Sequence, residues 1–216
     1  MPYEIVEFER NQIVETYNGS QIEEFFQVSF TDRDNNFYIL YSEKGLTPYP
    51  LILRKYDSEG NILTNRSLGE MSPDPLNYEP GVTKTESGEI FISWVNEDRD
   101  IEILKLDEFG NNTSLSLKIT SDLIGSFRLQ TPKIIELEDK SFIVAYRLSP
   151  KREPQSLFVQ KYSDEGRKIG NSHEITPAEF SGVYDLFASS DGGFYVFAPT
   201  LKDTIIHTKY DNNIKK

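Results

Sequence analysis

The sequence predicts an all-β protein built from about four copies of a four-stranded antiparallel unit. A strand-and-turn pattern returns along the 216 residues at nearly constant steps, which is the mark of a repeat architecture. Apolar residues alternate with polar ones as they do in strands, and no segment shows the helical period. The 14 Phe and 12 Tyr are spread over the whole length, so the chain has the material for a packed core.

The clearest repeated segment is a strand that ends in Lys, then an aromatic residue or Leu, then an acid or Ser, and finally a turn. Its copies cover 51–60, 101–110, 157–166 and 205–213, with Lys55, Lys105, Lys161 and Lys209 in equivalent positions. A weaker copy at 5–11 has Glu7 in the lysine position. The steps between these positions are 48, 50, 56 and 48 residues. In three copies the turn ends in Gly60, Gly110 or Gly166, which we expect in the left-handed conformation of a type I turn.

A hairpin with a polar tip precedes each of the four later copies. The tips and the strands after them cover 34–41, 86–94, 138–146 and 190–197, and Gly, Asn and Asp at the tips favour tight turns. An apolar strand lies before each tip. We expect the aromatic residues Phe37, Phe91, Phe142 and Phe194 in equivalent buried positions.

Each unit therefore has four strands, and the chain divides into 21–70, 71–121 and 122–176 as full units and 177–216 as the last one. Units of four strands at 40 to 50 residues are typical of β-propeller blades. We predict a β-propeller of about four blades in a single domain, with residues 1–20 as a half blade that completes the ring. In that arrangement the hairpin 5–17 lies beside the strands at 184–197. A five-unit ring or an open row of units is the alternative.

Two segments carry a resemblance to a known family. Asp191-Gly192-Gly193-Phe194-Tyr195-Val196, together with the strand and Gly turn at 158–166, resembles the β-propeller repeats of bacterial cell-surface and exported proteins. Those repeats end the second strand in Trp, whereas this chain has Trp only at Trp94, and Kelch and Trp-Asp signatures are missing. The resemblance implies a fold and a cell-surface or exported setting, but no reaction. The residues as given show no signal peptide and no transmembrane segment, so localisation is suggested by the resemblance alone.

Charge and composition exclude several kinds of function. The net charge is −12, which disfavours nucleic acid and anionic membrane surfaces as partners and, with no apolar span, membrane insertion. No cysteine is present, so disulfides and thiolate chemistry are excluded. The only histidines, His173 and His207, lie on different predicted strands, and phosphate-binding glycine motifs are absent. We assign no catalytic residue, metal ligand or cofactor.

Two local patterns have a structural interpretation. Asp32 to Asn36, with Glu43, partly matches a calcium-binding loop, but Phe37 occupies the position that needs Gly. We interpret this segment as a hairpin tip. The equivalent aromatics Tyr41, Trp94 and Tyr146 are interpreted as packing between neighbouring units.

Binding groups are expected on the loops, because loops on a rigid scaffold differ between repeats. The connections 42–50, 96–100, 148–155 and 199–204 and those at 71–81 and 119–131 should open on one face. The candidate ligand-binding residues on that face are Tyr49, Tyr78, Arg99, Arg128, Lys151 and Arg152. We predict a non-catalytic binding or scaffold module for a protein or carbohydrate partner. The alternative is a glycan-processing enzyme of glycosidase or sialidase type, with carboxylates lining a central channel.

Overall fold

The computed structural model confirms that the protein is all-β. It describes residues 12–17, 20–43, 49–72, 80–120, 127–150, 156–175, 180, 183–199 and 204–215. These ranges contain sixteen strands and no helix. Among them, accordingly, is no helix long and apolar enough to span a membrane.

The strands form four antiparallel sheets, each a meander in which consecutive strands pair. Sheet 1 contains β1 (Gln12–Tyr17), β2 (Ser20–Thr31), β3 (Phe37–Glu43), β4 (Tyr49–Tyr56) and β5 (Ile62–Met71). Sheet 2 contains β6 (Gly81–Lys84), β7 (Ile90–Val95), β8 (Ile101–Leu106) and β9 (Asn112–Ile119). Sheet 3 contains β10 (Phe127–Glu136), β11 (Phe142–Pro150), β12 (Ser156–Tyr162) and β13 (Lys168–Glu174), and sheet 4 contains β14 (Asp185–Ala188), β15 (Phe194–Pro199) and β16 (Ile205–Tyr210).

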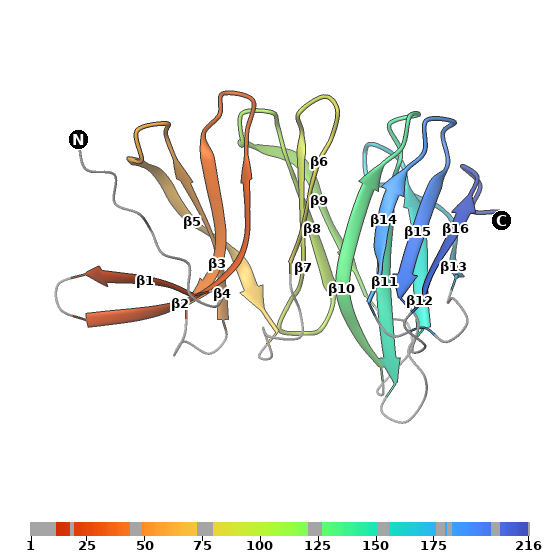
Figure 1. Cartoon of the computed structure of the whole chain (residues 1–216), viewed down its shortest axis with the longest axis horizontal. Helices are drawn as coiled ribbons and strands as arrows, with labels where there is room; N and C mark the ends of the chain where they lie inside the picture. Colours follow the sequence, from red (N-terminus) through yellow and green to blue (C-terminus); the bar gives the residue numbers. More distant parts are fainter. Residues whose placement is uncertain are drawn as a thin grey trace.

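The four sheets stand side by side in sequence order (Figure 1). Because each sheet is a meander, its two short turns lie at one end and its other connections at the opposite end. We call these the turn end, at the top of Figure 1, and the loop end. The turn end holds the turns 32–36, 57–61, 85–89, 107–111, 137–141, 163–167, 189–193 and 211–215.

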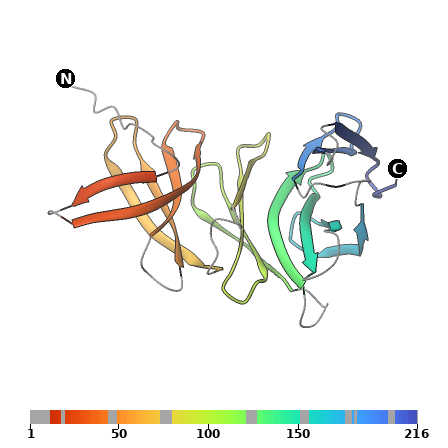
Figure 2. The same cartoon turned by 60° about the horizontal axis from the view of Figure 1, so that its bottom comes forward.

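β1 extends sheet 1 and pairs with the first half of β2, from Gln12 opposite Phe25 to Tyr17 opposite Ser20. This places β1 at the other end of the row from sheet 4 (Figures 1 and 2). The described residues therefore do not show the ring closure expected from hairpin 5–17, of which residues 1–11 lie outside the described part. Closure and the blade boundaries remain predictions.

The core lies between consecutive sheets. Each sheet has a leading face toward the sheet before it and a trailing face toward the sheet after it. Trailing residues Tyr38, Leu40 and Leu53 of sheet 1 pack with leading residues Ile92 and Trp94 of sheet 2. The next two interfaces repeat this arrangement, with the clusters around Phe91 and Phe142 and around Ile143 and Phe194. Tyr41, Trp94 and Tyr146 are 1%, 3% and 7% exposed. Trp94 and Tyr146 lie in clusters between neighbouring sheets, as expected, whereas Tyr41 packs with Ile39 and Ile52 of its own sheet.

The expected column of four phenylalanines is only partly correct. Phe142 and Phe194 are buried in equivalent positions, directly after the five-residue turns 137–141 and 189–193. The residue that follows the corresponding turn 85–89 is Ile90, so Phe91 is also buried but lies on the trailing face. Phe37 has the right register but is 37% exposed, because sheet 1 has no earlier sheet in the row to cover its outer corner.

Candidate functional site

The four repeated lysines form ion pairs at the turn end. Each binds a carboxylate on the first turn of its own sheet: Lys55 lies 3.0 Å from Asp32, Lys105 lies 3.0 Å from Glu89, Lys161 lies 3.1 Å from Asp139, and Lys209 binds Asp191. The sequence repeat thus reflects a repeated ion pair within each sheet.

Three of these lysines also bind the second turn of the following sheet. The Lys55 ammonium donates to the Phe109 carbonyl oxygen at 2.8 Å, that of Lys105 donates to Asp164 Oδ1 at 2.6 Å, and that of Lys161 donates to the Asn212 carbonyl oxygen at 3.3 Å. Each lysine therefore connects two neighbouring sheets, which is a structural role.

The titration of the partner groups fits that role. Burial alone would raise the pKa of Asp32, but hydrogen bonds from Asn36, Lys55 and Tyr38 outweigh it and hold the pKa below the usual aspartate value. Burial would likewise raise the pKa of Asp139, and hydrogen bonds from Ser141, Asn212 and Lys161 lower it well below that value. These carboxylates stay charged at neutral pH and bind protein groups, so they are not free to act in catalysis.

The segment that partly matches a calcium loop is a hairpin tip. Asp32 Oδ1 accepts hydrogen bonds from the backbone amides of Asp34 and Asn36, each at 2.9 Å, and Oδ2 accepts from Asn36 Nδ2 and the Tyr38 hydroxyl. Asp32 is 1% exposed. Across the described ranges, no group of three or more His, Cys, Asp or Glu residues could hold a metal ion.

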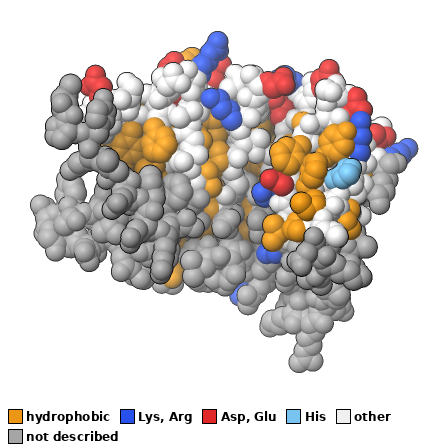
Figure 3. All heavy atoms as spheres, in the orientation of Figure 1, with side chains coloured by type: hydrophobic (Ala, Val, Ile, Leu, Met, Phe, Trp, Pro, Cys, Tyr) orange, Lys and Arg blue, Asp and Glu red, His pale blue; other side chains and the backbone are white. Residues whose placement is uncertain are grey.

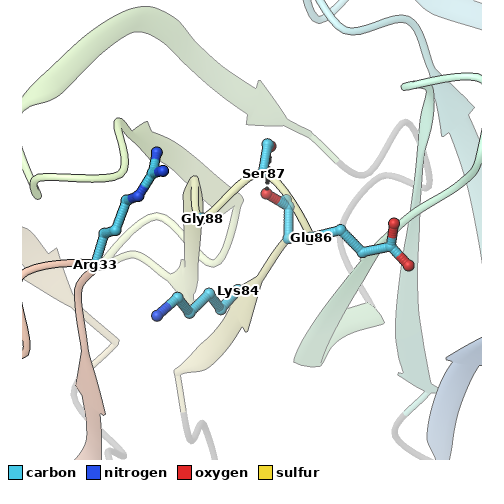
Figure 4. Close-up of a pocket in the computed structure, with 6 residues that line it drawn as sticks. Arg33, Lys84, Glu86, Ser87 and Gly88 are labelled. Carbon is cyan, nitrogen blue, oxygen red and sulfur yellow. Dashed lines mark hydrogen bonds between the residues drawn. The ribbon is translucent and has the colours of Figure 1, made fainter.

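A pocket of about 470 Å³ opens between the first turns of sheets 1 and 2 and is lined by Arg33, Lys84, Thr85, Glu86, Ser87 and Gly88. Figure 4 shows Arg33 and Lys84 on the same side and Glu86 pointing away from both. Arg33 pairs with Glu108 at 2.9 Å, and the Lys84 ammonium donates to the Thr31 carbonyl oxygen at 3.1 Å. Both cations therefore hold the two sheets together, and we assign no ligand to this pocket.

The loop end brings two of the predicted residues to the junction of sheets 1 and 2. Tyr49 is half-buried, begins β4 and pairs with Met71, and Met71 forms a bridge with Asn96. Asn96 begins the turn that carries Arg99, whose backbone amide donates to the Asn96 carbonyl oxygen at 2.9 Å. Arg99 is exposed with φ of 68°. The Asn96 side chain fixes this turn by accepting from the Asp100 amide at 2.9 Å and donating to Glu102 at 2.7 Å.

Acidic side chains surround Arg99. Glu97 is exposed and lies beside Glu70 of β5, and the negative charge of Glu70 is the main cause that raises the pKa of Glu97. Asp98 and Asp100 both pair with Lys118, at 3.4 and 2.9 Å. Carboxylates therefore outnumber cations at this junction, although four of the six candidate ligand-binding residues are basic.

Of the other four predicted site residues, the structure describes only the strand position of Arg128. Arg128 lies on β10, opposite Ser149, toward the loop end of sheet 3. Tyr78, Lys151 and Arg152 lie outside the described residues. Glu70 and Glu97 were missed by sequence reasoning, because they are 27 positions apart and only the pairing of β4, β5 and Asn96 brings them together.

The sequence matches no protein-family model and no curated protein sequence. Several solved structures have a similar fold. A polysaccharide lyase described as an ulvan lyase is 10% identical, with a TM-score of 0.62 over 96% of this chain and 62% of that one. The Aleuria aurantia lectin, in complex with α-methyl-L-fucoside, is 12% identical, with a TM-score of 0.52 over 81% of this chain and 52% of the lectin.

A third similar structure is the endo-arabinase from Bacteroides thetaiotaomicron, which is 13% identical, with a TM-score of 0.50 over 87% of this chain and 75% of the enzyme. The chain thus spans between about half and three quarters of the length of these proteins. At such low identity the likeness shows the fold alone, and this fold is shared with proteins that bind or process glycans.

Proposed function

We propose that the four sheets are consecutive blades of a β-propeller and that the chain is a non-catalytic module that binds a glycan at its loop end. The repeated meanders, stacked face to face in sequence order, support the blade assignment. The similar folds of an ulvan lyase and a fucoside-binding lectin favour a glycan over a protein partner.

The observation that carries the proposal is the convergence of Tyr49, Arg99, Glu70 and Glu97 at the junction of sheets 1 and 2. A tyrosine ring offers an apolar face for the C–H face of a sugar. Sugar hydroxyls both donate and accept hydrogen bonds, so they can bind carboxylates and a guanidinium in the same site. Because carboxylates outnumber cations here, we expect a neutral glycan and not an acidic one.

The carboxyl pair also bears on the alternative of a glycan-processing enzyme. A raised pKa is what a general acid needs, and Glu97 has one. Glu97, however, is exposed to solvent, whereas a general acid with a raised pKa is usually held in an apolar pocket. This exposure favours binding over cleavage.

A glycan array, read for both binding and product release, tests the proposal. We expect the wild type to bind neutral oligosaccharides without cleaving them. Arg99→Ala should weaken binding about tenfold or more. Arg167→Ala, which removes a 79% exposed arginine from a turn at the opposite end, should have no effect. Cleavage by the wild type that Glu97→Gln abolishes would establish the enzyme alternative, and the absence of any bound glycan would leave a protein partner.

A further inference from the structure

The trailing face of sheet 4 is largely apolar and uncovered. Phe187 is 52% exposed and Ile205 is 72% exposed, and Figure 3 shows hydrophobic side chains and a histidine together over the sheet at the right of the molecule. Exposed apolar patches of this kind mark interaction surfaces. The strand pairing arranges the face in three rows, which from the turn end are Phe187–Tyr195–Lys209, Asp185–Phe197–His207 and Pro199–Ile205.

The corresponding face is buried in every earlier sheet. The residues equivalent to Ile205, four positions before the repeated lysine, are Leu51, Ile101 and Leu157, and each is 0% exposed. In sheets 1 to 3 the following sheet provides this cover. Within the described ranges, the trailing face of sheet 4 therefore has the form of an interface without its partner.

His207 makes this face different from its three equivalents. The position two residues before the repeated lysine is occupied in the earlier sheets by Leu53, Ile103 and Val159, which are at most 1% exposed. His207 is exposed, and its ring stacks on Phe197 at a ring distance of 5.9 Å. In the part of the chain that the structure describes, its ring nitrogens have no hydrogen-bond partner. The partner of this face should therefore place an acceptor opposite His207.

Asp185 offers such an acceptor at the other end of the same row. Its Oδ1 accepts from the Lys133 ammonium at 3.1 Å and from the Leu186 amide at 2.9 Å. Among the described residues these are its hydrogen bonds, so Oδ2 is available for a further donor. The row thus begins with an available acceptor, ends with an available donor and has the Phe197 ring between them. A face of this composition is complementary to itself.

We propose that the trailing faces of sheet 4 from two copies of this protein pack on each other about a two-fold axis parallel to β15. The two β15 strands then lie opposite each other, and β14 of each copy lies opposite β16 of the other. Asp185 faces His207 of the second copy, and this pair occurs twice. Phe187 faces the stem of Lys209 of the second copy, and Phe197 faces its own equivalent. Sheets packed face to face in this way lie about 10 Å apart with their strands nearly aligned.

The polar groups select this orientation of the axis. An axis across the strands would place each strand opposite its own copy, so that Asp185 faces Asp185 and two carboxylates oppose each other. A shift by one row would place Asp185 opposite Phe187 and leave His207 without an acceptor. Of these three arrangements, only the axis along the strands gives each polar group a complementary one. The occupant is a second copy because one face supplies both halves of every contact.

The dimer has a consequence for binding, which rests on the proposed function. An axis parallel to the strands leaves the loop ends of both copies on the same side. The two candidate glycan sites can then engage one glycan-bearing surface together, and the second binding event gains from a raised effective concentration.

Sedimentation of the intact chain tests the dimer independently of any glycan. The face has only three strands, so we expect a dimer with a dissociation constant of roughly 1–100 μM. Ile205→Asp should raise that constant about tenfold or more, because it places a charge in the apolar contact. Ile169→Asp, a control on β13 where Ile169 is 44% exposed, should leave it unchanged. A wild type that stays a single chain up to about 1 mM, or that forms species larger than a dimer, would overturn the proposal, because a two-fold contact closes on itself.

A charge exchange tests the pairing of Asp185 with His207. His207→Asp places a carboxylate opposite Asp185, and we expect association to weaken about tenfold or more. Adding Asp185→Lys to the same chain should restore it. The control is His173→Asp, because this other histidine is exposed on β13, and it should have no effect. An unchanged association in His207→Asp, or a loss that Asp185→Lys does not reverse, would overturn the pairing.

Cross-linking determines the direction of the axis, because the chain contains no cysteine of its own. Asp185→Cys and His207→Cys chains, mixed under oxidising conditions, should form a disulfide-linked heterodimer, and neither variant alone should link efficiently. A linked homodimer of Asp185→Cys would show that the axis crosses the strands and would overturn the proposed arrangement.

Discussion

Gly110 of sheet 2 lies against the phenol hydroxyl of Tyr38 in sheet 1, so close that a Cβ at position 110 would overlap the oxygen. That hydroxyl donates to Asp32 Oδ2 at 2.9 Å and lies 3.1 Å from the Phe109 carbonyl oxygen. Gly110 has φ of 82°, and the equivalent Gly60 and Gly166 have φ of 86° and 81°. One turn therefore occurs three times with the same backbone, and its contacts to a preceding sheet differ.

The three glycines should respond differently to the same substitution. Gly60→Ala should destabilise the protein by about 1 kcal/mol, the strain of a left-handed alanine. Gly166→Ala and Gly110→Ala add overlap with Leu117 and Tyr38, and each should lose roughly 1–3 kcal/mol more, with Gly110→Ala the larger loss. Urea unfolding measures this order. Equal losses in all three variants would show that the turns do not touch the preceding sheets.

Lys105 should matter more than an exposed lysine with as many partners. Its side chain is 6% exposed and pairs with Glu89 and Asp164. Lys105→Met leaves both acids without their cation, and we expect a loss of about 1–3 kcal/mol, below the full value for a buried pair because the acids are partly exposed. Lys118→Met, at a 48% exposed pair, should lose less than about 1 kcal/mol. Similar losses in the two variants would contradict the role of Lys105 in joining the sheets.

The contribution of Asp139 to stability should depend on pH. Its pKa is held below the ordinary value of about 3.9, so its pairing stabilises the fold fully above about pH 5, and this stabilisation is lost as pH falls through 4 and below. Asp139→Asn should therefore be less stable than the wild type at neutral pH, with a difference that shrinks in acid. The control is Asp98→Asn, at a 69% exposed side chain. A stability difference between Asp139→Asn and the wild type that does not change with pH would show that the charge of Asp139 is not what stabilises the fold.

The Glu70–Glu97 pair at the loop end should change stability with pH in the opposite direction. The charge of Glu70 is the largest cause of the raised pKa of Glu97, so this repulsion weakens the fold at neutral pH and disappears as pH falls through the raised pKa. Glu70→Gln should return the pKa of Glu97 toward its ordinary value of about 4.3, as measured by NMR titration of the carboxyl carbon. An unchanged pKa would mean that the two groups do not interact.

Much of the fold could be predicted from the sequence, because local patterns determine it. The turns of Gly60, Gly110 and Gly166 adopt the expected left-handed conformation. His173 lies on β13 and His207 lies on β16, which are two different strands, as expected. Each of these features depends on a few neighbouring residues in the chain.

Features that depend on contacts between units could not be predicted in this way. Aligning Phe91 with Phe142 by residue type gave the wrong face, because Phe91 is the second residue after the turn 85–89, whereas Phe142 is the first after the turn 137–141. The lysine column was visible, but its acceptors in the following sheet, Phe109, Asp164 and Asn212, share no residue type. Glu70 joins the acidic residues around Arg99 from across the sheet junction, which spacing along the chain does not reveal.

The turn end holds the sheets together, and we propose that the loop end binds the glycan. NMR shift mapping of the labelled protein with the strongest oligosaccharide from the array tests it most directly. We expect the largest shifts around Tyr49 and at 96–100, with little change at the turns 85–89 and 107–111. Shifts concentrated at those turns, or in the pocket lined by Arg33 and Lys84, would contradict this division between the two ends.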